Sequence, residues 1–210
     1  MEIRRCVSDL LASNMYIITE NGNAIVIDPF RDTSPVSGLK VDLILLTHEH
    51  YDHISGVNLW KETTGAKVLC SSICAENIQD SRKNMAHLFE VFCQLQTWIK
   101  LEKLPDADEN YTCSADERFE DKCSFKWQGH DFLLFGIPGH SAGSAGILLD
   151  RKWFFSGDSM MDGRPVELRF PGGSRKQWKE VTEPRLRLLP EKLTVCPGHF
   201  GMFFINRNQG

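Results

Sequence analysis

Four potential metal ligands lie within six positions of this chain. Residues 47–53 read Thr-His-Glu-His-Tyr-Asp-His, so the candidates are His48, His50, Asp52 and His53. Imidazole nitrogens and carboxylate oxygens are suitable ligands for zinc, iron or manganese. Because alternate residues point in different directions, such a tight run can divide its ligands between two ions. We predict that His48 and His50 bind one ion, and that Asp52 and His53 bind the other.

Three other short loops place a glycine next to a further ligand candidate. Two of them read Pro-Gly-His and end at His140 and His199, and the third reads Ser-Gly-Asp and ends at Asp158. Glycine permits unusual backbone angles and a close approach to a metal centre. We therefore expect His140 to complete the ligands of the first ion and His199 those of the second, with Asp158 bridging both.

The ligand loops follow predicted strands. The apolar run 42–46 ends immediately before the first loop, and the runs 152–156 and 193–195 precede two of the others. The C-terminal ends of strands are where α/β folds commonly place chemistry. Short β-branched runs separated by a Glu-Asn-Gly-Asn turn also predict a hairpin. The further predicted strands are 15–19, 24–28, 67–71, 123–127, 131–137 and 146–149.

Helices are predicted between these strands, which indicates a layered α/β domain. We expect helices at 56–64 and 72–80, and a longer one at 84–104. A helix should also start at Ser174, because Gln177 three residues later completes a capping-box pattern. The apolar stripe of the 84–104 helix consists of Met85, Leu88, Phe92, Leu95 and Ile99, which recur at intervals of three and four.

Residues 102–122 are predicted to form a solvated acidic loop, because they contain eight acidic and three basic side chains and few large apolar groups. The predicted domain organisation is therefore a single domain over residues 1–210, with a helical and acidic insert at about 72–122.

The composition is that of one ordinary globular domain: 210 residues, 41% hydrophobic and 25% charged. The formal charge of −4 gives no general attraction to polyanions, so we expect no nucleic-acid or membrane partner. The first residues lack the apolar core of a signal peptide. Seven cysteines without a CxxC pair favour free thiols, and together these features predict a cytoplasmic protein.

The motif order HxHxDH, Pro-Gly-His-Ser, Ser-Gly-Asp and Pro-Gly-His resembles that of the metallo-β-lactamase superfamily. The hairpin from Met15 to Asp28, which ends Val-Ile-Asp-Pro, is also similar to the opening of that family. The resemblance covers nearly the whole chain. It implies an α/β fold, a four-layer αββα sandwich, with the metal ions at one edge.

The sequence differs from three groups within the superfamily. Asp158 stands where the commonest class of zinc β-lactamases has cysteine, and His50 stands where flavodiiron proteins have glutamate. RNA-processing members usually carry basic extensions that this chain lacks. The sequence most resembles the small glyoxalase II-like hydrolases. It ends at Gly210 without the helical glutathione-binding domain of glyoxalase II, so a glutathione thioester is not the expected substrate.

The resemblance implies a dinuclear hydrolase that cleaves a carboxylic ester, thioester or lactone of small size with a metal-bridging hydroxide. The expected cofactors are two zinc ions, with iron or manganese as alternatives. Asp52 and Asp158 are the candidate catalytic carboxylates, as ligands first and proton shuttles second. Tyr51, Arg164 and Arg169 are candidate substrate contacts, whereas Glu49 should point away from the ions.

Two other functions are compatible with the same motifs. One is a mononuclear iron dioxygenase resembling persulfide dioxygenase, with iron held by His48 or His50 together with His140 and Asp158. The other is a metal-binding protein without catalysis. A homodimer is a further prediction, since the apolar stripe of the 84–104 helix could face a second copy.

Overall fold

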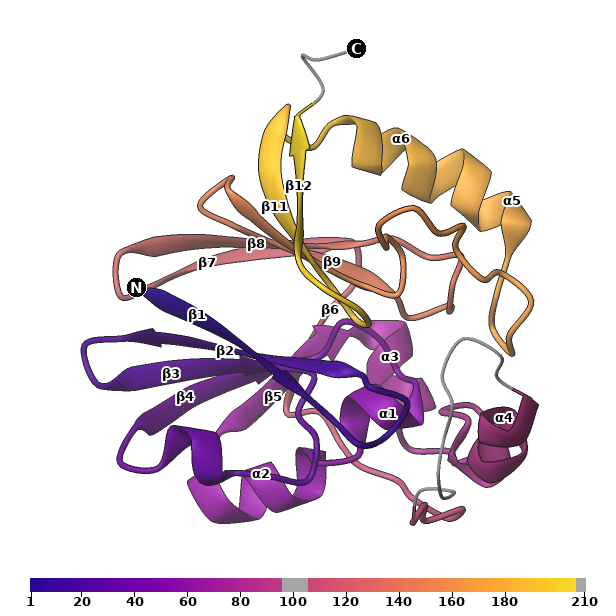
Figure 1. Cartoon of the computed structure of the whole chain (residues 1–210), viewed down its shortest axis with the longest axis horizontal. Coiled ribbons are helices and arrows are strands. Elements are labelled where there is room, and N and C mark those ends of the chain that lie inside the picture. The colour runs from indigo at the N-terminus through magenta and orange to yellow at the C-terminus, as the bar shows by residue number, and fades with distance from the viewer. Residues whose placement is uncertain (96–105, 207–210) are drawn as a thin grey trace.

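A computed structural model describes residues 1–95 and 106–206 of the chain. Two six-stranded sheets lie face to face, and helices cover the outer face of each (Figure 1). The first sheet has the order β1-β2-β3-β4-β5-β6, antiparallel from β1 to β3 and parallel from β3 to β6. Its strands are β1 (Glu2–Val7), β2 (Asn14–Glu20), β3 (Asn23–Ile27), β4 (Lys40–Leu45), β5 (Lys67–Ser71) and β6 (Glu117–Phe119).

The second sheet has the order β12-β11-β10-β9-β8-β7. Its neighbours are antiparallel except β10 and β11, which run parallel. Its strands are β7 (Lys122–Trp127), β8 (His130–Gly136), β9 (Ala145–Leu149), β10 (Trp153–Gly157), β11 (Lys192–Pro197) and β12 (Phe203–Asn206).

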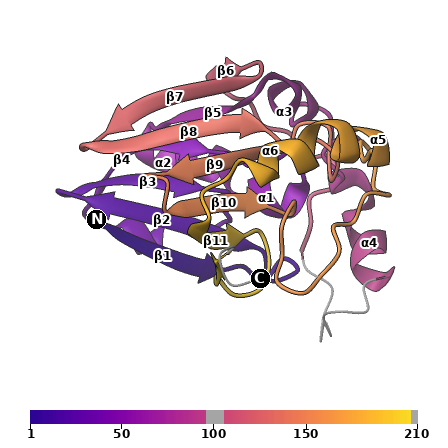
Figure 2. The same cartoon turned by 90° about the horizontal axis from the view of Figure 1, so that it is seen from above.

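Two groups of helices form the outer layers. On the first sheet lie α1 (Tyr51–Ile54), α2 (Val57–Thr64) and α3 (Ser72–Asn77), with a single 3-10 turn at η1 (Ser34–Val36). The 3-10 turn η2 (Ala86–Leu88) leads into α4 (Phe89–Leu95), which lies beyond the ends of the strands. On the second sheet lie α5 (Arg175–Gln177), the π-helical turn η3 (Trp178–Thr182) and α6 (Glu183–Arg187), which run on as one helix (Figure 2). The Ser174 hydroxyl accepts a hydrogen bond from the Gln177 amide at 3.2 Å, which confirms the predicted helix start.

Three apolar interfaces hold the four layers together. Successive side chains of a strand point to opposite faces, so β2 buries Met15 and Ile17 against the first helical layer and Tyr16 and Ile18 between the sheets. A third cluster, which includes Phe154, packs the second sheet against α6. This is the predicted αββα sandwich, in a single domain. No helix among the described residues is long and apolar enough to cross a membrane.

All nine predicted strands are present within two residues of their predicted ends. The strands β1, β6 and β12 were not predicted. The prediction of a solvated loop over 102–122 is wrong for its second half, because β6 pairs with β5 and the side chains of Tyr111, Cys113 and Phe119 are buried.

The predicted helix at 84–104 differs from the structure in its start and in its buried face. Met85 adopts a left-handed conformation (φ 68°), so the helical turns begin after it. Phe89 and Cys93 are the buried residues of α4, whereas Leu88 and Leu95 of the predicted stripe are 52% and 73% exposed. Positions 96–104 lie outside the described residues. A homodimer through this stripe stays a prediction.

Candidate metal centre

Loops from both sheets meet at one end of the sandwich. The segment between β4 and α1 carries His48 and His50, α1 itself carries Asp52, and the β8–β9 connection carries His140. Asp158 directly follows β10. His53 lies in α1 and His199 follows β11, so the structure brings all seven predicted ligands to one place. These residues, distant in sequence, become neighbours because strand ends from both sheets lie along the same edge.

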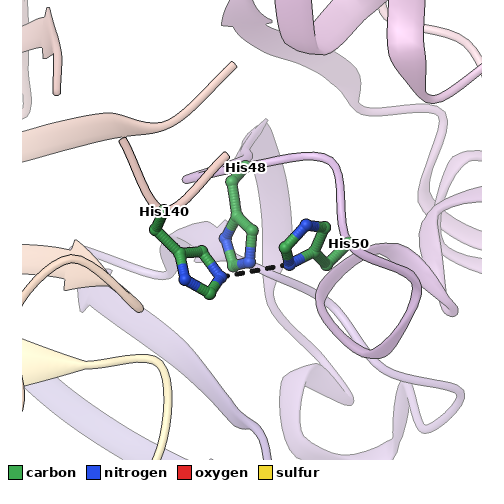
Figure 3. A group of neighbouring side chains, drawn as sticks. All are labelled: His48, His50 and His140. Atoms are coloured by element: carbon green, nitrogen blue, oxygen red, sulfur yellow. Dashed lines mark hydrogen bonds between the residues drawn. The ribbon is translucent and has the colours of Figure 1, made fainter. Parts of the chain in front are cut away.

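His48, His50 and His140 form a triple-histidine group (Figure 3). The Nε2 atom of His140 lies 3.1 Å from Nδ1 of His50. The Nε2 atom of His48 is buried and has no hydrogen-bond partner among the described residues. One nitrogen of each ring therefore faces a common point.

Asp52, His53 and His199 form a second, mixed group. The Nε2 atom of His199 lies 3.3 Å from Oδ2 of Asp52 and 3.4 Å from Nε2 of His53. The Nε2 atom of His53 is 3.5 Å from Oδ2 of Asp52. One nitrogen or oxygen of each side chain again faces a common point.

The carboxylate of Asp158 lies between the two groups. Its Oδ2 atom is 3.5 Å from Nε2 of His140 and 3.5 Å from Nε2 of His199. Its Oδ1 atom is 3.5 Å from Nε2 of His53. Asp158 is the one of the seven residues that contacts a member of each group through the same oxygen, which is the position expected of a bridging ligand.

The donor set fits two divalent cations. Ligands of a tetrahedral ion with bonds of 2.0–2.1 Å are about 3.3 Å apart. The pair His50–His140 and the three pairs of the mixed group have donor atoms 3.1–3.5 Å apart, and all donor atoms of a group lie within 4.8 Å of one another. All seven side chains are buried. Carboxylates and imidazoles buried this closely carry a large desolvation cost unless cations or protons compensate it.

Backbone and side-chain oxygens orient the histidine rings. The Nδ1 atoms of His140 and His199 lie 2.9 Å and 3.1 Å from the carbonyl oxygens of Glu167 and Leu11. These carbonyls require Nδ1 to carry the proton, so Nε2 of each ring is left with its lone pair towards the centre. The sequence contains no signal for either carbonyl.

Asp28 supports the first ligand loop from the end of β3. Its Oδ1 atom accepts a hydrogen bond from the Thr47 amide at 2.7 Å, and its Oδ2 atom accepts one from the Thr47 hydroxyl at 2.5 Å. The same Oδ2 lies 3.3 Å from Nδ1 of His53. Sequence reasoning missed this role. Since β3 and β4 are parallel neighbours, the position of Asp28 at the end of β3 is the signal that could have located it.

The two groups differ in charge. Burial, reinforced by the neighbouring His140, lowers the pKa of His50 to about 3, so this ring is neutral and able to bind a metal. Burial also disfavours charge on His53, but the carboxylates of Asp52 and Asp158 outweigh it and raise its pKa to about 9. Burial opposes charge on Asp158 as well, but the surrounding histidines hold its pKa well below the ordinary value.

Glu49 points away from both groups, as predicted, and joins three loops. Its buried carboxylate accepts hydrogen bonds from the Ser141 hydroxyl at 2.8 Å, the Asn77 side chain at 2.9 Å and the Gly143 amide at 3.2 Å. It thereby links the first ligand loop to the His140 loop and to α3.

Of the three predicted substrate contacts, the structure brings only Arg164 to the centre. The Tyr51 side chain is fully buried in the core, where Arg31 donates to its hydroxyl at 2.6 Å and the Asp108 amide donates at 3.0 Å. Arg169 is exposed and pairs with Glu167, with Nε 2.8 Å from Oε1. The structure therefore brings neither Tyr51 nor Arg169 to the candidate metal centre.

A cavity of about 260 Å³ opens above the two groups. His50, Asp52, His140, Asp158 and His199 form its floor. Its walls are mostly apolar, with two charged residues, and consist of Leu11, Met85, Phe89, Phe92, Met161, Arg164, Pro165, Glu167, Phe170 and Phe200. Among these wall residues the sequence predicted Arg164 as a substrate contact, but it did not single out the aromatic residues, which have no distinguishing spacing.

Comparison with known proteins agrees with this geometry. A family model described as metallo-beta-lactamase superfamily matches residues 8–199. A hydroxyacylglutathione hydrolase from Klebsiella pneumoniae is 24% identical over 88% of this chain, and the chain spans 61% of that relative's length. The hydroxyacylglutathione hydrolase GloC from Haemophilus influenzae is 25% identical over 84% of this chain and 80% of its own length.

Solved structures show the same fold. BLEG-1, a B3 metallo-beta-lactamase, has a TM-score of 0.80 at 22% identity, over 99% of this chain and 96% of its own. ETHE1 from Myxococcus xanthus has a TM-score of 0.71 at 21% identity, over 97% and 80%. TTHA1623, solved in a di-iron-bound form, has a TM-score of 0.69 at 24% identity, over 95% and 93%.

Proposed function

The chain belongs to the metallo-beta-lactamase superfamily, and from that premise we propose that it is a dinuclear metal-dependent hydrolase of a small carboxylic ester, thioester or lactone. One observation carries the proposal. Two groups of three donor side chains, with Asp158 between them, lie at the base of an apolar cavity, and five of these seven residues line it. The relatives named hydroxyacylglutathione hydrolase support hydrolysis as the reaction class.

The residues present would hold two ions, which we propose to be zinc. His48, His50 and His140 would hold one, Asp52, His53 and His199 the other, and Asp158 would contact both. When bound, the ions would activate a water molecule near pH 7 and stabilise negative charge on the substrate's carbonyl oxygen. Asp52 and Asp158 act as ligands, because a carboxylate bound to a dication is a weak base.

The protein's own groups then have three tasks. The apolar walls exclude bulk water from the reacting carbonyl, which strengthens electrostatic interactions there. The carbonyls of Glu167 and Leu11 keep His140 and His199 in the ligand tautomer. In the overall reaction the acyl carbon gains the oxygen of water. The bond to the leaving oxygen or sulfur breaks with its electron pair, and the leaving atom takes the second proton.

Metal content tests this proposal first. Protein purified without added metal or chelator should contain close to two zinc ions per chain by elemental analysis, and should hydrolyse members of an ester, thioester and lactone panel. Close to one iron per chain would instead favour the iron dioxygenase, and oxygen consumption with a persulfide would be the next assay.

Asp158→Ala should lower metal occupancy and abolish turnover, because the substitution removes the carboxylate that contacts both groups. Asp162→Ala is the matched control, since Asp162 is an exposed carboxylate four residues later. An Asp158→Ala protein that kept both metals and a normal kcat would contradict the bridging role.

A further inference from the structure

The walls of the cavity differ on its two sides. On the side of the triple-histidine group, the Phe170 ring lies edge-on to the rings of His50 and His140, with centroids 6.1 Å and 5.8 Å away. Phe92 of α4 packs edge-on against Phe170 at 4.9 Å. Met85 and Phe89 continue this apolar wall. A substrate group over the triple-histidine group therefore meets aromatic carbon.

On the side of the mixed group, the wall carries a cation. The guanidinium of Arg164 lies over the ring of Phe200, 4.1 Å from its centroid, and Phe200 adjoins His199. In the part of the chain that the structure describes, no carboxylate lies within ion-pair range of Arg164. The other charged wall residue, Glu167, is already paired with Arg169. Arg164 is thus held by ring stacking with its hydrogen-bond donors available.

The size of the cavity limits the substrate. A cavity of 150 Å³ lined by apolar residues holds benzene, so about 260 Å³ holds on the order of ten non-hydrogen atoms of the whole substrate. A planar guanidinium matches a carboxylate in shape and charge.

Resting on the proposed hydrolase activity, we propose that the substrate has an apolar group at one end and a carboxylate at the other, with the scissile carbonyl between them and on the order of ten non-hydrogen atoms in all. The apolar group packs against Phe92 and Phe170, and Arg164 binds the carboxylate. This assigns a substrate class, an amphiphilic ester or thioester, to the cavity.

The kinetic test uses thioesters of 3-mercaptopropionate with straight acyl chains of increasing length, and the methyl esters of the same compounds as neutral controls. For the wild type, KM should fall by about fourfold per added methylene until the cavity is full. Arg164→Gln should raise KM by about tenfold for the carboxylates and leave KM for the methyl esters within twofold. Phe92→Ala should flatten the dependence on chain length.

Matched controls separate these effects from general damage. Arg118 is exposed on β6, and Phe204 is 63% exposed on β12, so Arg118→Gln and Phe204→Ala should behave as wild type. All variants should bind zinc in the wild-type stoichiometry and retain cooperative thermal unfolding.

A binding measurement distinguishes failure of this inference from failure of the proposed function. The probes are thioethers, the S-alkyl derivatives of 3-mercaptopropionate, which cannot be hydrolysed, and their binding is measured by calorimetry. Affinity that rises with alkyl length and falls about tenfold in Arg164→Gln supports the substrate class even if no ester or thioester is hydrolysed. Affinity that is independent of alkyl length, or unchanged in Arg164→Gln, overturns it even if hydrolysis is observed.

Discussion

The candidate ligands depend on residues that do not themselves face the centre. Asp28 shows this most directly, because its two carboxylate oxygens accept hydrogen bonds from Thr47 and one of them, Oδ2, lies 3.3 Å from Nδ1 of His53. A carboxylate beside one nitrogen of a ligating imidazole orients the ring and makes the other nitrogen a better ligand. Asp28 therefore acts as a positioning residue for His53.

Asp28→Asn should weaken zinc binding by about tenfold to a hundredfold, because the amide keeps an oxygen for the Thr47 amide but lacks the charged oxygen that lies beside Nδ1 of His53. Competition with a coloured chelator measures the dissociation constants. Asp32→Asn, at an exposed carboxylate in the following loop, should leave them unchanged. Equal zinc affinity in Asp28→Asn and wild type would show that Asp28 only supports the fold of the loop.

Gly198 is a second residue on which the geometry of the candidate metal centre depends. A Cβ atom there would collide with Oδ1 of Asp158 and lie 2.8 Å from Cε1 of His53. Gly198→Ala should therefore displace Asp158 and reduce bound metal by at least one ion per chain, measured by elemental analysis. Gly201→Ala is the control, since a Cβ atom at Gly201 meets no atom within 4 Å. Full occupancy in Gly198→Ala would mean that the loop shifts without cost to the ligands.

At the scale of the elements, the ends of strands position the ligands and a buried carboxylate joins their loops. Glu49 lies between the ligands His48 and His50 but points towards the His140 loop and α3, where three donors bind its carboxylate. These contacts hold a loop of the first sheet against a loop of the second sheet.

Glu49→Ala should lower the free energy of unfolding by about 3 kcal/mol, because it removes the acceptor of the buried Ser141 hydroxyl and Gly143 amide and of the half-buried Asn77 amide. Urea unfolding of zinc-free protein measures this effect apart from metal binding. Glu62→Ala, at an exposed position of α2, should change stability by less than about 0.5 kcal/mol. A similarly small effect of Glu49→Ala would show that water replaces the carboxylate in this network.

The elements that were predicted correctly are determined by residues within them or next to them. Apolar β-branched runs and turn residues located nine strands, and the spacing of residues within each motif identified the ligands. The strands that were missed depend on distant partners. β6 is a three-residue strand that exists because it pairs with β5, and β1 is mostly polar because it lies at the edge of its sheet.

The face of α4 was predicted wrongly for a related reason. Met85 and Leu88 fit a helical period in the sequence, but the left-handed conformation of Met85 shows that the two do not belong to one continuous helix. Of the cavity walls, Arg164 was predicted as a substrate contact, but the aromatic residues were not. Phe92, Phe170 and Phe200 come from separate elements, and a single aromatic residue in a sequence looks the same in a core as in a cavity.

At the scale of the whole molecule, the centre lies where the two halves of the sandwich meet. The triple-histidine group combines His48 and His50 from the first sheet with His140 from the second. Backbone hydrogen bonds also join the halves here: the Asn14 amide donates to Gly198 and the Ala145 amide donates to Thr47, each at 2.7 Å. Bound ions would therefore cross-link the two sheets.

Zinc should consequently stabilise the entire fold and not only its loops. Zinc at about a thousand times its dissociation constant adds about 4 kcal/mol to stability by mass action. For a domain of this size that corresponds to an increase in Tm of about 10 °C over chelator-treated protein, measured by calorimetry. The transition should remain single, because both sheets contribute ligands to each group. Asp158→Ala should lose most of the increase, whereas Asp162→Ala should keep it. Two separate transitions in zinc-free protein, with zinc raising only one of them, would show that the sheets unfold independently and that the metals stabilise only their local loops.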